Sequence, residues 1–316
     1  MSPFLFKGPS LRAFILAAAH SRRLRAFAQE HGLRFGAQRF VAGTTLEDLV
    51  ARARRENEAG RRVSCAYLGE GVGDAGSAAR VAADFLDIVD RVARERLEAS
   101  VAVKLTHLGL DAGPLVALEN ATRIVERAAA NGIFVRMDME EARYVERTLE
   151  IYRALRARGL TNVGVVLQSY LRRSSADLRA LLPFHPNLRI VKGAYSEPPA
   201  LAYQRRAEID AAFKDLVADA LAGGAYVAVA THDRRLIDAT LALCESLDIS
   251  PRAREGERLE FQMLLGVRES LQDELVRRGL PVRVSVPFGT DWYPYLMRRL
   301  AEKPSNLWLI ARNLRP

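Results

Sequence analysis

Short apolar segments alternate along most of this chain with longer stretches of amphipathic pattern. The eight apolar segments, several rich in β-branched residues, are residues 62–68, 100–105, 133–138, 163–168, 188–193, 225–231, 259–264 and 282–287. Intervening stretches such as 77–99 and 139–159 repeat apolar residues at helical spacing. Eight strands alternating with helices over about 250 residues are typical of a parallel (β/α)8, TIM-type barrel. A doubly wound parallel sheet is the alternative.

The first 60 residues have a different pattern, which predicts two or three helices. One of these is expected to begin at a capping box formed by Thr44 and Glu47. The apolar run FILAAA near the start is short and lies within a continuing amphipathic pattern, so it is interpreted as helix and not as a leader. Because no long Pro/Gly/Ser linker appears, we expect an N-terminal helical arm (1–60) followed by one barrel (61–316).

Composition and charge narrow the class of protein. An apolar fraction of 49% is enough for a large core, and no run approaches the ~18 apolar residues of a membrane span. The net charge is +9, with basic clusters interrupted by acidic residues and without a zinc-finger or aromatic-interleaved basic pattern. Nucleic-acid binding is therefore not expected, whereas contact with an anionic membrane surface suits the charge.

The two cysteines, Cys65 and Cys244, lie far apart without metal-ligand spacing. We expect each to be a buried small side chain in a reducing compartment. A cytoplasmic location follows, with peripheral contact at the inner membrane as a further expectation.

The barrel hypothesis makes a prediction about chemistry, because active sites in this fold lie at the carboxyl ends of the strands. Six of the eight segments finish with polar or charged residues: Lys104, Asp138, Gln168, Lys192, Thr231 with His232, and Gln262. Only five of the 47 basic residues are lysines, so two lysines at strand ends are informative. His107 is close enough in sequence to line the same site. The chain has no HxH, HExxH or GxSxG motif, so neither a metal site nor a serine nucleophile is expected.

Two further stretches indicate ligand contact. In RIVKGAY (189–195), a strand enters a turn where Gly193 and Ala194 permit close approach to the backbone. In VATHD, the end of a strand runs into a helix N-cap, where backbone N–H groups beside His232 suit a phosphate.

The glycines of GEGVGDAG have the spacing of a dinucleotide-binding turn. The next strand should then end in an acidic residue that binds the ribose hydroxyls. It ends instead at Lys104. We therefore favour a flexible loop over a nicotinamide site.

The stretch YLMRRLAEKPSN (295–306) reads as an amphipathic helix with two adjacent arginines. At about 100° per residue, its polar arc carries Tyr295, Arg298, Arg299 and Glu302. The arc is either an ordinary solvated face or a pair of guanidinium groups directed at a carboxylate or phosphate.

Taken together, the blocks VAVKL, RMDMEEA, VVLQSYLRR, RIVKGAY, VATHD, EFQMLLG and YLMRRLAEKPSN resemble the proline dehydrogenases, in their monofunctional bacterial form. The resemblance covers roughly residues 60 to 310. It implies an FAD enzyme on a (β/α)8 barrel that oxidises L-proline to Δ1-pyrroline-5-carboxylate by hydride transfer to flavin N5.

The resemblance also implies roles for residues of this chain. Asp138 and Arg189 would be catalytic, with Asp138 orienting the substrate clamp and Arg189 near the flavin N5 edge. The substrate-binding set would be Lys104, Leu264, Ser285, Tyr295, Arg298, Arg299 and Glu302. The FAD-binding set would be Met139, Gln168, Lys192, Gly193, Ala194, Thr231 and His232.

Within the substrate set, the arginines and Lys104 would bind the proline carboxylate, Leu264 and Tyr295 would contact the ring, and Glu302 would brace Arg299. Ser285 departs from the family pattern, because some relatives carry an aromatic residue there. A roomier site is expected, with tolerance of hydroxyproline as the hypothesis.

Partners also follow from the resemblance: a quinone electron acceptor and a separate pyrroline-5-carboxylate dehydrogenase. Two rival interpretations remain at this stage. One is another flavin barrel resembling methylenetetrahydrofolate reductase, and the other is a basic barrel that binds nucleic acid.

Overall fold

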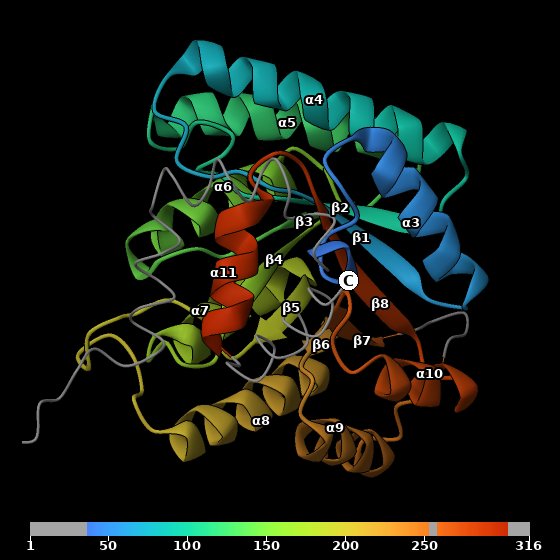
Figure 1. The fold of residues 1–316 in the computed structure, drawn as a ribbon. Coiled ribbons are helices and arrows are strands. Elements are labelled where there is room, and N and C mark those ends of the chain that lie inside the picture. The colour runs from blue at the N-terminus through green and yellow to red at the C-terminus, as the bar shows by residue number, and fades with distance from the viewer. Residues whose placement is uncertain (1–36, 253–257, 303–316) are drawn as a thin grey trace, which may run out of the picture.

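The computed structural model describes residues 37–252 and 258–302, and these form a closed barrel of eight parallel strands in sequential order (Figure 1). The strands are β1 (Arg62–Tyr67), β2 (Ala99–Val103), β3 (Val135–Met137), β4 (Val163–Gln168), β5 (Asn187–Val191), β6 (Tyr226–Ala230), β7 (Leu259–Leu264) and β8 (Val282–Phe288). The predicted barrel is confirmed, and the doubly wound alternative is excluded because β8 pairs with β1.

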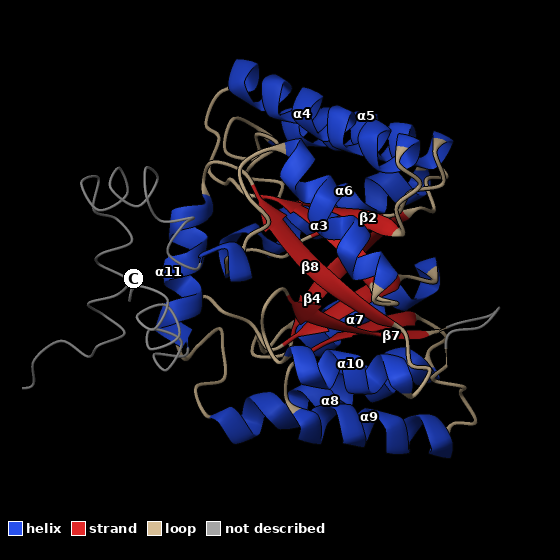
Figure 2. Cartoon of the chain, turned by 45° about the vertical axis from the view of Figure 1, so that its right-hand side comes forward, coloured by secondary structure: helices blue, strands red, loops and turns tan. Residues whose placement is uncertain are grey.

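Helices surround this barrel on its outside (Figure 2). They are α3 (Leu46–Glu58), α4 (Ala75–Arg94), α5 (Pro114–Ala130), α6 (Val145–Ala157), α7 (Ser174–Leu181), α8 (Arg206–Ala222), α9 (Arg234–Ser246) and α10 (Glu269–Arg277). A further helix, α11 (Trp292–Glu302), lies apart from them (Figure 2). Short 3-10 helices occur at Ala37–Arg39, Ala142–Tyr144 and Leu182–Phe184.

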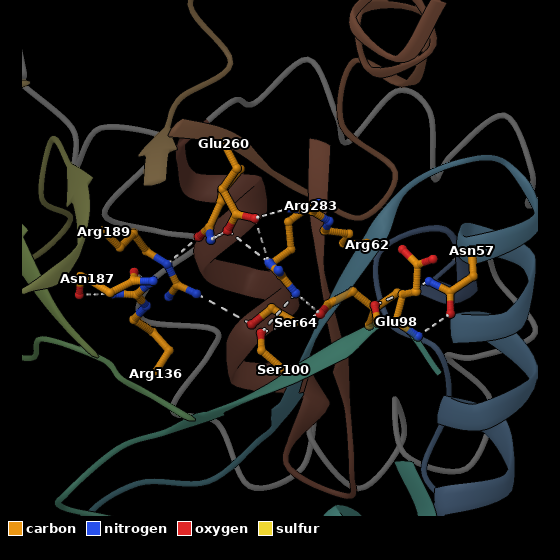
Figure 3. A network of polar contacts seen from close by, with 12 residues as sticks. Asn57, Arg62, Ser64, Glu98, Ser100, Arg136, Asn187, Arg189, Glu260 and Arg283 are labelled. Carbon is orange, nitrogen blue, oxygen red and sulfur yellow. Dashed lines mark hydrogen bonds and ion pairs between the residues drawn. The ribbon is translucent and has the colours of Figure 1, made fainter. Parts of the chain in front are cut away.

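The apolar core lies between the strands and the helices, whereas the inside of the barrel is polar. Residues such as Val101, Val135 and Val284 face the helices and are fully buried. Strands covered on both faces normally read as continuous apolar runs. Here the alternate positions carry serine, arginine or glutamate, and their side chains bond across the barrel (Figure 3). The interior therefore differs from the layers of branched apolar residues that commonly fill this fold.

Helix α3 occupies the space that the last helix of a regular (β/α)8 barrel would fill. It precedes β1 in the chain, yet it packs against both β8 and β1. Its apolar face (Leu49, Val50 and Ala53) is buried there. The helix that follows β8 is thereby free to lie elsewhere.

Helix α11 lies at the carboxyl ends of the strands, away from the surrounding helices (Figure 2). It packs through Trp292, Tyr293 and Leu296 into a small apolar cluster with Phe40, Val41 and Leu68. Leu68 directly follows β1. The cluster therefore holds α11 over the end of the barrel where the predicted site lies.

The start of α3 differs from the sequence prediction by one residue. Thr45, not Thr44, is the N-cap, and its hydroxyl accepts a hydrogen bond from Asp48 N (3.1 Å). Asp48 accepts in return from the backbone N–H groups of Thr44 and Thr45, both at 3.0 Å. The expected pair of Thr44 and Glu47 is wrong because the aspartate satisfies two backbone donors, while Glu47 is exposed.

The sequence also makes predictions about the cysteines, about possible membrane spans and about the N-terminal helices. Cys65 and Cys244 are buried and free, as predicted. No helix within 37–252 or 258–302 is long and apolar enough to cross a membrane. The helices predicted within the first 36 residues lie outside the described residues.

Candidate active site

The carboxyl ends of the strands bring most of the predicted site residues to one end of the barrel. Asp138 and Met139 follow β3, Lys192 and Gly193 follow β5, and Thr231 with His232 follow β6. Gln168 is the last residue of β4, and Lys104 directly follows β2. Gln262 instead lies within β7, below the rim.

Arg189 is held at the centre of this end by three hydrogen bonds from its guanidinium group. Nη1 donates to the carboxylate of Asp138, and Nε donates to Gln262 Oε1 at 2.5 Å. Nη2 lies 3.4 Å from the hydroxyl of Ser64 on the opposite side of the barrel. A side chain tied to β3, β7 and β1 at once has a fixed position, and its charge remains directed to the mouth.

Beside Arg189, inside the barrel, lies a buried ion pair between Glu260 and Arg283 (Figure 3). Arg283 Nε donates to both carboxylate oxygens, at 2.8 and 3.1 Å, and Gln262 Nε2 donates to the same carboxylate. Burial alone would raise the pKa of Glu260, but the charge and hydrogen bonds of Arg283 outweigh it and hold the pKa at about 2. Glu260 is therefore ionised at neutral pH, and its carboxylate orients the amide of Gln262 so that the oxygen faces Arg189.

A second buried carboxylate, Glu140, connects the ends of β2, β3 and β4. It accepts from the backbone N–H of Thr106 at 3.1 Å and from its hydroxyl at 2.5 Å. The backbone carbonyl of Glu140 accepts from Gln168 Nε2 at 2.8 Å. Burial raises the pKa of Glu140. The sequence reasoning missed this residue, although its place next to Asp138 and Met139 was a usable signal.

Lys104 and His107 lie on the loop after β2. Lys104 Nζ is 3.7 Å from the carboxylate of Glu70, another residue that the sequence reasoning missed. The His107 ring is buried against Tyr67 and Phe85, with ring centroids 5.3 and 5.9 Å away. Burial, with the charge of Lys104, lowers the pKa of His107 to about 4.

His107 should make the stability of the protein depend on pH. An unfolded histidine takes up a proton near pH 6.5, whereas the folded one resists until about pH 4. The free energy of unfolding should therefore fall by about 3 kcal/mol per such group as the pH is lowered across this window. We expect His107→Phe, which keeps an aromatic ring against Tyr67, to flatten this decline in urea titrations from pH 7.5 to 4. An equally steep decline in the variant would contradict the assignment.

On the other side of the mouth, Lys192 lies between two carboxylates. Its ammonium group is 2.5 Å from Asp210 and 3.5 Å from Asp233, and Arg206 approaches both acids as well. Asp233 is the N-cap of α9, accepting from Arg235 N, which confirms the predicted helix start. Its own N–H donates to the hydroxyl of Thr231 at 3.1 Å.

Gly193 lies in the turn after β5, next to Lys192. Its φ of +106° favours glycine, and an added Cβ would lie 2.2 Å from the ring of Tyr170. Glycine is therefore required at position 193, because the Tyr170 ring occupies the space that a side chain would fill. The next residue, Ala194, is exposed.

Helix α11 brings two further predicted site residues, Tyr295 and Arg299, to the same end of the barrel. The Arg299 guanidinium lies over the Tyr295 ring, 5.4 Å from its centroid. The charge of Arg299 also acts on His232, whose pKa is lowered to about 4, first by burial and then by Arg299 and Arg268. His232 Nε2 accepts from the backbone N–H of Leu264 at 2.9 Å. Arg299, His232 and Leu264 therefore lie in one region.

Ser285 lies on β8 beside Leu264 of β7, and it is partly buried. The side chains of Arg298 and Glu302 lie outside the described residues, although the backbone of both belongs to α11. Among the described residues, no group of three or more His, Cys, Asp or Glu side chains is placed to hold a metal ion.

The chain was compared with known families and proteins. A family model described as proline dehydrogenase matches residues 49–311. Proline dehydrogenase 1 of Bacillus subtilis (strain 168) is 37% identical over 304 residues, covering 96% of this chain and 99% of that protein. A proline dehydrogenase of Deinococcus radiodurans is 36% identical, covering 88% and 89%.

A solved structure shares the fold. It is the crystal structure of proline utilization A (PutA) from Bdellovibrio bacteriovorus inactivated by N-propargylglycine, with a TM-score of 0.80 and 24% sequence identity. The match covers 92% of this chain but only 35% of that much longer chain. At this identity, the likeness supports the barrel architecture alone.

Proposed function

The chain belongs to the proline dehydrogenase family, and from this premise we propose that it oxidises L-proline to Δ1-pyrroline-5-carboxylate with bound FAD. Proline would lose a hydride from the ring carbon next to nitrogen and a proton from the nitrogen, which leaves a C=N bond. FAD when bound would supply the two-electron acceptor, at flavin N5. The observation that carries the proposal is Arg189, held between Asp138 and Gln262 at the barrel mouth beneath α11.

The residues at the mouth fit FAD. The turn after β5 carries only the small residues Gly193 and Ala194, and the exposed Ala194 would let a large ligand approach the backbone there. Lys192 and the start of α9 beside Thr231 and His232 would suit its phosphates. Met139, Gln168 and Ala194 complete the proposed cofactor-binding set, with Gln168 fixed by Glu140.

We assign Arg189 and Asp138 the catalytic roles. Arg189 would place a fixed positive charge where negative charge develops on reduction, which is most effective when the donor is already held in position. Asp138 would hold Arg189 and orient the substrate-binding cations.

The substrate carboxylate would be bound by Arg299, Arg298 and Lys104, with Glu302 bracing Arg299. Leu264, Tyr295 and Ser285 would contact the proline ring. Holding the ring in one orientation contributes a large part of the rate in such a transfer. The position of Arg299 beside His232 and Leu264 supports this role.

The experiment that tests the proposal is a visible spectrum of the purified protein, taken before and after anaerobic addition of L-proline. Flavin bands that bleach with proline are the expected result. Bands that do not bleach would favour another flavin barrel, and absence of flavin after adding FAD would contradict the cofactor assignment.

For the carboxylate clamp, we predict that Arg299→Ala loses about 2–5 kcal/mol of substrate binding, chiefly as a higher KM for L-proline. The reason is that the substrate carboxylate would keep fewer cationic partners. Arg277→Ala, at an exposed arginine of α10, is the control. Steady-state kinetics with unchanged KM in Arg299→Ala would rule out the clamp.

The small side chain at Ser285 predicts that trans-4-hydroxy-L-proline is turned over within about 10²-fold of the kcat/KM for L-proline, since an apolar pocket rejects an added hydroxyl by only about that factor. Ser285→Phe should lower turnover of hydroxyproline more than that of proline. No detectable turnover of hydroxyproline by the native chain would end the hypothesis.

The proposed electron acceptor is a membrane quinone, and a separate pyrroline-5-carboxylate dehydrogenase would consume the product. The net charge of +9 suits transient contact with an anionic membrane surface from the cytoplasmic side. Reduction of a soluble quinone by the proline-reduced enzyme, and salt-sensitive binding to anionic vesicles, are the corresponding measurements.

A further inference from the structure

Arg136 is a fully buried cation inside the barrel. Only 2% of it is exposed, and it lies on β3, which the proposed catalytic Asp138 directly follows. Nη1 donates to the carbonyls of Val165 and Asn187, at 3.1 and 2.7 Å, and Nη2 donates to the side-chain oxygen of Asn187. All of these partners are neutral.

The other three arginines in this network, Arg62, Arg189 and Arg283, each lie beside a carboxylate, whereas Arg136 forms no such pair among the described residues. Arg189 pairs with Asp138, and Arg283 pairs with Glu260. Within the part of the chain that the structure describes, Arg136 forms no ion pair, and its Nε has no hydrogen-bond partner. An isolated buried charge is costly, so its retention calls for a reason.

Residues of two neighbouring segments leave space for this guanidinium group and contact it. Gly164 on the neighbouring strand β4 leaves the space, because an added Cβ would lie 2.6 Å from Arg136 Nη1. The ring of Phe134 lies beneath the guanidinium carbon, 4.9 Å from the ring centroid. Burial lowers the pKa of Arg136 to about 9, which leaves it charged at neutral pH.

The guanidinium group of Arg136 lies deeper in the barrel than the proposed site, by two residues of strand. Arg136 lies on β3 two residues before Asp138, which directly follows that strand, and its partner Asn187 precedes Arg189 by two residues on β5. Two residues of strand span about 7 Å. Figure 3 shows Arg136 beside Asn187 and close to Arg189.

We propose that Arg136 is an electrostatic tuning residue whose buried charge, which forms no ion pair, raises the reduction potential of a flavin bound at the mouth. This inference rests on the proposed function. Arg136 touches neither substrate nor cofactor in this role; it acts by making the floor of the site more positive. Across about 10 Å at an effective dielectric constant near 20, one charge changes an equilibrium by about tenfold.

The test is the midpoint potential of the bound flavin, measured anaerobically against a reference dye, in the native protein, Arg136→Met and Arg136→Lys. Arg136→Met should lower the ratio of reduced to oxidised flavin at a fixed potential by about tenfold, which is about 30 mV for two electrons. Arg136→Lys keeps the charge and should retain most of the native potential. Arg147→Met, the same exchange at an exposed arginine, is the control and should not change it.

Two results would overturn the proposal. One is a ratio of reduced to oxidised flavin in Arg136→Met, at the same fixed potential, that lies within twofold of the native ratio. The other is a change in Arg136→Lys as large as that in Arg136→Met, which would assign the effect to packing. If Arg136→Met does not fold, Arg136→Gln carries the same expectation, because its amide can still donate to Asn187 O. A native chain that takes up no FAD would instead overturn the proposed function, and this inference with it.

Discussion

Replacing Arg189 with methionine is expected to lower kcat for L-proline by about 10²–10³-fold, the usual loss when one preorganised charge at a reacting centre is removed. Methionine keeps an unbranched side chain but offers no donors to Asp138 and Gln262, which now bind the guanidinium group. The rate of flavin reduction in single-turnover experiments measures the effect without interference from the electron acceptor.

Two comparisons make this result specific to Arg189. Arg147→Met removes an exposed charge of α6 and should leave the rate unchanged. Arg189→Lys restores charge but cannot reach three partners at once, so it should recover only part of the rate. Flavin reduction at the native rate in Arg189→Met would remove this residue from the proposed catalytic set.

The second large effect concerns stability. Glu260→Leu should lower the free energy of unfolding by about 3–5 kcal/mol, because it leaves Arg283 buried without its carboxylate. Guanidinium titrations followed by circular dichroism measure the loss. The double variant Glu260→Leu/Arg283→Met should recover most of it, since replacing both members of a buried pair is often neutral or stabilising. A double variant as unstable as the single one would show that the loss is due to packing and not to an unpaired charge.

Because the pKa of Glu260 is lowered in the folded state, the free energy of unfolding should decline at low pH. This pKa is about 2 when folded, below the ordinary value of 4.5. The stabilisation is therefore complete above about pH 4.5 and is lost as the pH falls towards 2. Glu260→Leu should lack this part of the acid-induced decline.

Much of the fold follows from local pattern. The apolar segments match the observed strands closely, and β4 and β7 have the same limits as their segments. Polar residues at strand ends indicated which end carries the site, because parallel strands in a barrel point the same way. Local pattern does not say which face of a doubly buried strand points inward. The ion pair of Glu260 and Arg283 and the neutral partners of Arg136 therefore emerged only with the barrel register.

Other features were missed for a related reason. Glu140 lies next to two predicted site residues, but its task is to bind Thr106 on another loop, 34 positions away. The role of α3 depends on closure of the barrel, which brings β8 beside β1. The capping box was misplaced by one residue because Thr44 and Thr45 both suit an N-cap, and only the contacts of Asp48 distinguish them.

Because α3 takes the place of the last barrel helix, the residues that close the barrel are different from the residues of α11 that reach the mouth. Since α3 seals the junction between β8 and β1, the barrel is closed without any contribution from α11. Among the described residues, α11 packs on a small apolar cluster, and it carries Tyr295 and Arg299 to the mouth. If α11 binds the substrate as proposed, divergence in this segment alters which amino acid is accepted while the enclosing wall keeps its sequence. Exchange of residues 290–302 between relatives is therefore a direct route to new substrate preferences on an unchanged scaffold.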